Sequence, residues 1–131
     1  MSVEITFPGG LRVDAAFKDV VVKTDQKQKR GGNGSEPEPF QLFLASIGTC
    51  AGIYVLRFCQ SRDIPTDNIK LVQHHEVDPM GNGLAKIILE IIVPPEFPEK
   101  YHSALVRAAN QCPVKRAIFE PPEIEVKTVV A

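Results

Sequence analysis

The sequence has no tryptophan, only three cysteines among 131 residues, and little charge of either sign in excess, with a net charge of −1. Without a basic field the chain has no general means of collecting nucleic acid or an anionic membrane surface. Three thiols are too few, and odd in number, for the disulfide framework of a small secreted domain. We therefore expect reduced thiols, a cytoplasmic location, and neither nucleic acid nor membrane as a partner.

Targeting and membrane signals are also missing. The N-terminus, "MSVEITFPGG", has no basic region followed by an apolar run, and the longest apolar segment, residues 40–58, is interrupted by Gln41, Ser46 and Arg57. Apolar residues make up 44% and charged residues 24% of the chain, as in an ordinary globular protein. The length suits one domain, and we expect a single domain over residues 1–131.

Motifs for metals, phosphates and serine nucleophiles are absent. There is no C-x-x-C and no H-x-x-x-H pair, and the adjacent His74 and His75 would point to opposite faces of a strand. The loop "RGGNGS" lacks the Lys-Ser or Lys-Thr that a phosphate loop carries after its second glycine. No G-x-S-x-G elbow exists. We expect no metal and no cofactor.

What the sequence does contain is two groups of strands with helices between them. Turn-bounded runs rich in β-forming residues predict a meander, a later hairpin and a last strand, at residues 2–7, 11–17, 20–25, 68–78, 83–93 and 123–130. Caps, prolines and helical spacing predict a first helix from 35–39 to about Ser61, a second ending near Cys112, and a short turn at 114–119. The predicted class is α+β.

The first predicted helix is apolar on nearly every side, which predicts burial all round. Five of its residues are small and would let another backbone approach closely, namely Ala45, Ser46, Gly48, Ala51 and Gly52. A chain of this size has little surface left to cover such a helix, whereas a twin helix across a two-fold axis covers one side without further sequence. We expect an intertwined homodimer.

The three cysteines lie in different parts of the predicted helices. Cys50 and Cys59 are nine residues apart, so on a helix they face opposite ways and lie about 13 Å apart along the axis, which excludes a disulfide between them. Cys59 is interpreted as an apolar core residue. Cys112 precedes Pro113 at the predicted end of the second helix, and the small neighbours of Cys50 would permit its approach. From these features alone, two packed core thiols are the favoured interpretation.

Two segments resemble the motifs of one family. "EPFQLFLASIGTCAGIYVL" resembles the central-helix motif of the OsmC/Ohr family, a Pro-rich entry followed by Leu-Leu-x-Ala-x-x-x-Cys, and "NQCPVKRAI" resembles its second motif. Cys50 and Cys112 occupy the two cysteine slots. The resemblance implies an OsmC-like intertwined homodimer, in which two central Cys-bearing helices are wrapped by antiparallel sheets from both chains.

The resemblance also implies a reaction. In the peroxidases of this family the central cysteine attacks a small apolar hydroperoxide and becomes a sulfenic acid, and the second cysteine resolves it as a disulfide that a dithiol then reduces. Cys50 would be peroxidatic and Cys112 resolving. General thiol chemistry agrees, because the thiolate is the nucleophile and a sulfenic acid condenses with a nearby thiol.

The activating charges depart from the family pattern. The family's peroxidases use an arginine held by a glutamate ten residues before the first cysteine, and that position is Phe40 here, with Glu38 two residues away. Arg12 is the match expected for the arginine, and Arg30 is a second candidate. Two rivals stay open: a non-catalytic module of the same fold that binds a small apolar ligand, and a plain core without chemistry at its thiols.

Overall fold

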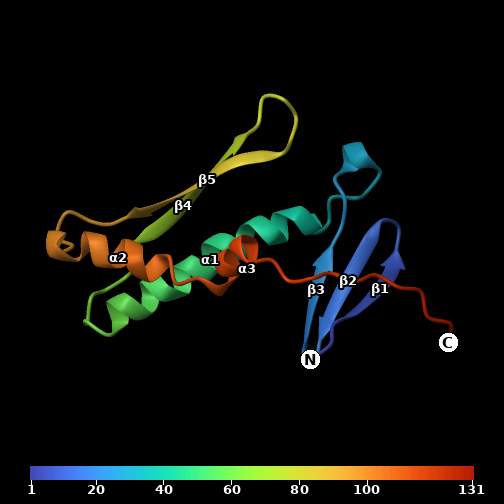
Figure 1. Ribbon diagram of the computed structural model, residues 1–131, viewed down its shortest axis with the longest axis horizontal. Helices are drawn as coiled ribbons and strands as arrows, with labels where there is room; N and C mark the ends of the chain where they lie inside the picture. The colour runs from blue at the N-terminus through green and yellow to red at the C-terminus, as the bar shows by residue number, and fades with distance from the viewer. The chain divides into compact units, whose positions relative to one another are not determined.

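The structure is a computed structural model that describes residues 1–131, and its chain forms two compact units, residues 1–45 and 46–131. The α+β class predicted from the sequence is confirmed, with strands in a three-stranded and a two-stranded antiparallel sheet and three α-helices (Figure 1).

The first unit begins with the predicted meander. Strands β1 (Glu4–Gly9), β2 (Arg12–Phe17) and β3 (Val20–Thr24) pair antiparallel in the order β1-β2-β3. The turn between β1 and β2 contains Gly10 with φ of 57°, a left-handed conformation that glycine adopts without steric cost. Thr24 fastens the end of β3, because its hydroxyl donates to the Val13 carbonyl at 2.6 Å.

A buried carboxylate organises the loop after β3. Asp25 is fully buried and accepts from the backbone N–H groups of Gln26 (2.7 Å), Asn33 (3.3 Å) and Ser35 (3.0 Å), and from the Ser35 hydroxyl (2.8 Å). The Asp25 N–H in turn donates to the Pro37 carbonyl at 3.2 Å. The loop, which includes the short 3₁₀ helix η1 (Gln28–Arg30), is therefore tied at its base by one side chain.

Helix α1 (Pro39–Gln60) starts and stops close to where the sequence predicts. Pro39 is its first residue, where a missing N–H costs nothing. Glu38 precedes it, and its N–H donates to the Gln41 side chain at 2.9 Å, one half of a capping box. At the other end Asp63 has a positive φ of 53°, and the Ile64 N–H donates back to the Cys59 carbonyl at 2.9 Å, so the chain leaves the helix in a sharp turn.

The all-round burial expected for α1 is not met within one chain. Its fully buried residues form a single stripe at a spacing of four, Ile47, Ala51, Val55 and Cys59. Other large apolar side chains of the helix stay exposed, Phe40 at 58%, Phe43 at 40% and Ile53 at 38%. By length and composition alone α1 could also cross a membrane, a criterion that core helices of other proteins also meet.

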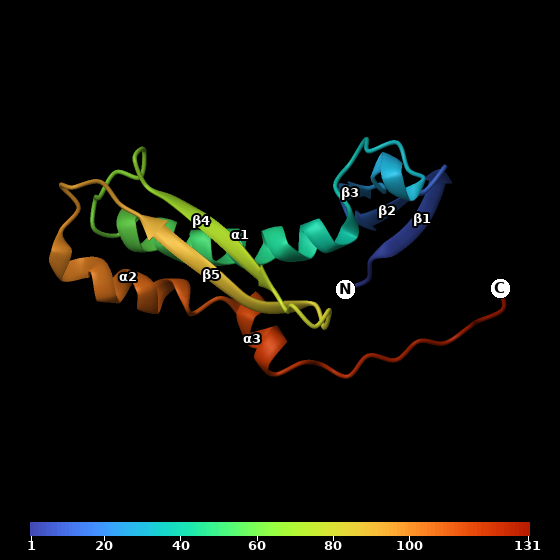
Figure 2. The same ribbon diagram turned by 90° about the horizontal axis from the view of Figure 1, so that it is seen from above.

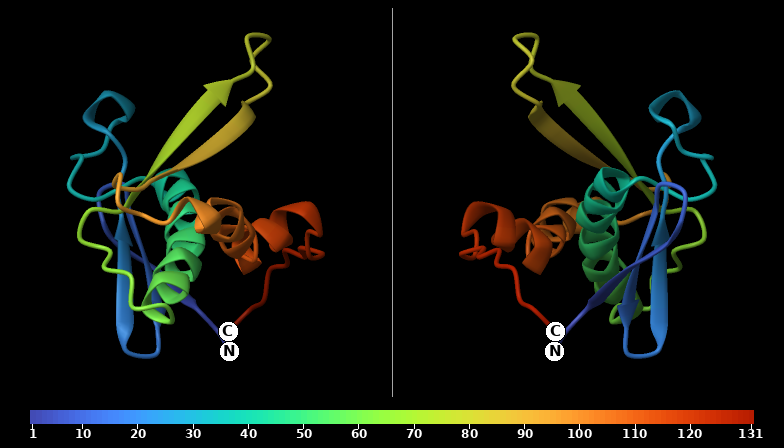
Figure 3. Two further views of the ribbon diagram at one scale, coloured as in Figure 1. Left: turned by 90° about the vertical axis from the view of Figure 1, so that its left-hand side faces the viewer. Right: turned by 90° about the vertical axis from the view of Figure 1, so that its right-hand side faces the viewer.

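The second unit packs a hairpin and a helix against the C-terminal half of α1. Strands β4 (Lys70–Val77) and β5 (Leu84–Ile92) form the predicted hairpin, and α2 (His102–Ala109) follows the short η2 (Glu99–Tyr101). Figures 2 and 3 show both lying beside α1. The core comprises Val55, Cys59, Phe97 and Leu105, bordered by half-buried residues of the hairpin such as Leu71 and Ile91.

Gly48 marks a close approach on α1. A Cβ atom built there would lie 2.6 Å from the Gln73 side-chain oxygen of β4 and 3.8 Å from Leu89 of β5. The small residue thus makes room for the hairpin, whereas a Cβ at Gly52 would meet nothing within 4 Å. The sequence prediction that something packs closely on the small residues of α1 is met at Gly48 by this chain's own hairpin.

The last predicted strand is wrong. After α3 (Pro113–Phe119), residues 120–131 form no strand and are exposed throughout, including Ile124, Val126, Val129 and Val130. The physical reason is that a strand forms only where an edge accepts its hydrogen bonds, and none of this chain's five strands pairs with the segment. Alternation of apolar and charged residues predicted the conformation but not the missing partner.

Candidate active site

Cys50 and Cys112 come together in the second unit from separate elements. Cys50 lies in the middle of α1, half-buried, one position from the buried residue Ala51. Cys112 follows the end of α2 and is 2% exposed. The two thiols are hydrogen-bonded to each other. The sequence left open whether the two cysteines are merely packed in the core or act as a pair. The structure brings their thiols into direct contact, and both are free.

Local structure explains how Cys112 is held. It is the N-cap of α3: its sulfur accepts the Lys115 N–H at 3.4 Å, and Pro113 takes the first helical position. At the end of α2, the Asn110 N–H still donates to the Val106 carbonyl and the Gln111 N–H to the Ala108 carbonyl. Cys112 is thus fixed between the end of one helix and the start of the next.

The surroundings of Cys112 favour its protonated form. Burial raises the pKa of the Cys112 thiol, and the hydrogen bond to Cys50 raises it further, against the opposing N–H groups of Lys115 and Val114. Because only thiolates are strong nucleophiles, this arrangement makes Cys112 a poor first attacker.

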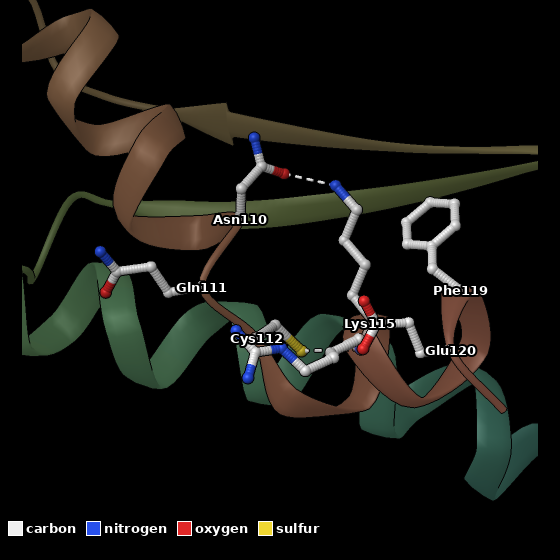
Figure 4. Close-up of a pocket in the computed structure, with 7 residues that line it drawn as sticks. Asn110, Gln111, Cys112, Lys115, Phe119 and Glu120 are labelled. Carbon is white, nitrogen blue, oxygen red and sulfur yellow. Dashed lines mark hydrogen bonds between the residues drawn. The ribbon is translucent and has the colours of Figure 1, made fainter. Parts of the chain in front are cut away.

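A pocket of about 280 Å³ opens beside Cys112. Its lining comes entirely from the segment after α2 and from α3: Asn110, Gln111, Cys112, Lys115, Arg116, Phe119 and Glu120. Figure 4 shows the Lys115 ammonium turned toward the Asn110 side-chain oxygen, with which it forms a hydrogen bond, and the ring of Phe119 at the other end. Cys112 is the one cysteine in this lining, and the pocket was not predicted from the sequence.

The predicted activating residues lie in two separate groups of charged side chains in the first unit, one around Arg12 and one around Glu38. Arg12 lies 3.4 Å from the Asp14 carboxylate, two residues along β2, and its Nε is buried without a hydrogen-bond partner. Glu38 is buried and lies 3.4 Å from Arg30 and 3.5 Å from Lys27. The structure therefore joins Glu38 to Arg30, the second arginine candidate, and to Lys27, which sequence reasoning did not consider.

The remaining sequence predictions concern Cys59, Phe40 and metal binding. Cys59 is fully buried in the core, where burial raises its pKa and nearby Arg62 partly opposes the rise. Phe40, in the position of the family's glutamate, is exposed and packs against Phe43 in a tilted arrangement, with ring centroids 5.6 Å apart. No group of three or more His, Cys, Asp or Glu side chains is placed to hold a metal ion.

Comparison with known proteins gives a family and a fold. The family model described as OsmC-like protein matches residues 32–127, which include both cysteines of the site. No curated protein matches the sequence.

Several solved structures share the fold at low identity. A protein from Psychrobacter arcticus described as an osmotic stress induced and detoxification response protein has a TM-score of 0.73 and 18% identity, with 89% of this chain and 87% of that chain covered. An organic hydroperoxide resistance protein from Vibrio cholerae, with captopril in one active site, has a TM-score of 0.59 and 20% identity over 90% and 84%. One from Legionella pneumophila has a TM-score of 0.55 and 19% identity over 90% and 89%.

Proposed function

The chain belongs to the OsmC-like family, and from that premise we propose that it is a thiol-dependent peroxidase that reduces organic hydroperoxides. The observation that carries the proposal is the hydrogen bond between Cys50 and Cys112, two cysteines 62 residues apart that occupy the family's two motif positions. The names of the Vibrio and Legionella structures, organic hydroperoxide resistance proteins, support the choice of substrate.

The two cysteines divide the reaction between them. The Cys50 thiolate attacks the terminal oxygen of the hydroperoxide, the O–O bond breaks, and the departing alkoxide takes a proton and leaves as an alcohol. Cys50 is then a sulfenic acid, which Cys112 attacks with loss of water to give a disulfide. A dithiol reduces that disulfide and completes the cycle. Keeping Cys112 protonated until this second step suits a resolving thiol.

The first step needs a positive charge that stabilises the Cys50 thiolate. We propose Arg12 and Glu38 for this work, as the family resemblance implies, with Arg30 as the competing arginine because it lies against Glu38. The variants Arg12→Gln and Arg30→Gln separate the two. Loss of the activating arginine slows the peroxide reaction of Cys50, while loss of the other leaves it near the wild-type rate.

The active form we propose is an intertwined homodimer in the cytoplasm. Apolar residues of α1 and of the tail at 120–131 stay exposed in one chain. A second copy of the chain, placed so that the two α1 helices meet, would cover the exposed apolar residues of α1. Its strands would offer free edges with which the tail at 120–131 could pair.

Counting thiols tests the proposed reaction. One equivalent of an organic hydroperoxide should remove two of the three free thiols per chain and leave a Cys50–Cys112 disulfide, detectable by peptide mass spectrometry. Cys50→Ser should lose none, and Cys112→Ser should lose one, as a sulfenic acid that dimedone traps.

Cys59→Ala is the matched control, because it removes a thiol of the same chain that lies outside the pair. After treatment with the hydroperoxide, this variant should still lose two free thiols per chain. A wild-type protein that keeps all three thiols would refute the peroxidase and leave the apolar-ligand module or the inert core.

A further inference from the structure

Asp25 is a buried charge to which the proposed reaction gives no role. It follows the end of β3 and is fully buried. The hydrogen bonds to its carboxylate, first the one from the Ser35 N–H, lower its pKa to about 2, so it is ionised at neutral pH. A buried carboxylate is costly unless hydrogen-bond donors compensate it. The donors that do so all belong to one loop, residues 26–37.

The two carboxylate oxygens of Asp25 hold the two ends of that loop. Oδ1 accepts the N–H of Gln26, where the loop begins. Oδ2 accepts the Asn33 N–H and both the N–H and the hydroxyl of Ser35, where the loop returns. An asparagine presents an oxygen at only one of these two positions and N–H groups at the other. Asp25→Asn would therefore leave one end of the loop without its acceptor.

Backbone contacts order the interior of the loop. The N–H groups of Arg30 and Gly32 both donate to the Lys27 carbonyl, at 2.9 Å and 3.1 Å. A Cβ atom at Gly32 would collide with the Gln26 carbonyl oxygen, so only glycine fits there. The places of Lys27 and Arg30 are thus set by a backbone that Asp25 closes.

Two cations of the loop meet Glu38. Lys27 lies 3.5 Å from one oxygen of the buried Glu38 carboxylate, and Arg30 lies 3.4 Å from the other. Two cations and one anion leave this group with one positive charge in excess. Glu38 directly precedes Pro39, the first residue of α1, which is the helix that carries Cys50. The loop therefore holds a positive group at the beginning of that helix.

We propose that Asp25 is a positioning residue for the activation of Cys50, because its carboxylate holds the loop in the conformation that keeps Lys27 and Arg30 against Glu38. The inference rests on the proposed function for the part that Glu38 and a nearby cation play at Cys50. It adds a residue that acts through the loop and not by contact with the substrate.

The rate at which Cys50 is oxidised tests this role. Cumene hydroperoxide is added to the reduced protein, samples are quenched with acid, and the Cys50–Cys112 disulfide is quantified by peptide mass spectrometry. Asp25→Asn should slow its formation by at least about tenfold, because misplacing a catalytic group by about 1 Å can cost about a hundredfold in rate. Ser35→Ala, which removes one donor to Asp25, should show a smaller loss, and Ser35→Thr, which keeps the hydroxyl, should react like wild type.

Thr24→Val is the matched control. Thr24 is the buried neighbour of Asp25, and this substitution removes a hydrogen bond to the Val13 carbonyl while it leaves the carboxylate in place. It should lower the free energy of unfolding but keep the oxidation of Cys50 close to the wild-type rate. Equal slowing in Thr24→Val and Asp25→Asn would overturn the proposal, since lost stability alone would then explain both. Circular dichroism confirms that each variant is folded.

A double-mutant cycle tests whether Asp25 acts through Glu38. In a Glu38→Gln background the loop cations have lost their carboxylate, so Asp25→Asn should slow the oxidation of Cys50 little further. Two effects that multiply would show independent action and overturn the proposed route.

Alkylation separates this test from the proposed peroxidase. The rate at which iodoacetamide modifies Cys50 at neutral pH depends on the thiolate and needs no peroxide. It should fall in Asp25→Asn and stay at the wild-type value in Thr24→Val. A protein that ignores peroxide yet shows this difference would refute the proposed function and support the role of Asp25. Unchanged alkylation in Asp25→Asn would overturn that role even where peroxide is consumed.

Discussion

Cys112 serves two structural needs with one sulfur atom. It caps α3 by accepting the Lys115 N–H, and it shares a hydrogen bond with Cys50. The identity of the two cysteines could be predicted from the motifs, since each lies in a recognisable sequence context. Their hydrogen bond and the burial of Cys112 could not, because both depend on how α2 ends and α3 begins beside α1. The same holds for Glu38, whose partners lie eight and eleven residues away in a loop without periodicity.

The cap makes a prediction about stability that is independent of catalysis. Cys112→Ser keeps an oxygen that can accept the Lys115 N–H, whereas Cys112→Ala leaves that donor without a partner. We expect Cys112→Ala to lower the free energy of unfolding by roughly 1 kcal/mol relative to Cys112→Ser. Urea unfolding under reducing conditions measures the difference. Equal stabilities of the two variants would show that the sulfur contributes nothing as a cap.

At the scale of helices and strands, local interactions determine where most of these elements begin and end. The meander, the hairpin and both ends of α1 follow from turns, caps and alternation, and the sequence predicts them to within a few residues. The tail at 123–130 has the same alternation as β1 but no strand beside it. Periodicity thus predicts which face of an element is apolar, while pairing depends on residues far away or on another chain.

The loop after β3 should respond to acid through Asp25. The hydrogen bonds from Ser35, first from its N–H and then from its hydroxyl, with those from Gln26 and Asn33, lower the pKa of Asp25 to about 2. A carboxyl of lowered pKa stabilises the fold above its unfolded pKa of about 4, and that contribution is lost as the pH falls through the folded value. We expect the free energy of unfolding to decline between about pH 4 and pH 2 for this reason.

Asp25→Asn removes the titrating group, so its stability should be lower than that of wild type at pH 7, and the gap should narrow as the pH falls toward 2. Asp19→Asn, in the exposed turn before β3, is the matched control and should run parallel to wild type. Chemical denaturation at a series of pH values gives the comparison. A gap that stays constant with pH would contradict the role of the carboxylate charge.

At the scale of the whole molecule, the exposed apolar residues of α1 call for a partner. The sequence makes this helix apolar on nearly every side, yet one chain buries only a single stripe of it. The rings of Phe40 and Phe43 contact each other, and both side chains remain exposed. A soluble oligomer removes such side chains from water at a gain of roughly 1.5–3 kcal/mol for each phenylalanine fully covered.

The homodimer proposal is therefore testable at Phe43. Phe43→Asp places a charge where the second copy would bury an aromatic ring, and it should weaken the dimer by at least about tenfold in its dissociation constant. Val77→Asp changes an exposed apolar residue at the end of β4 and should leave association unchanged. Sedimentation velocity over a range of protein concentrations measures both. A wild-type protein that sediments as a monomer at every concentration would refute the dimer, and equal association of the two variants would remove α1 from its interface.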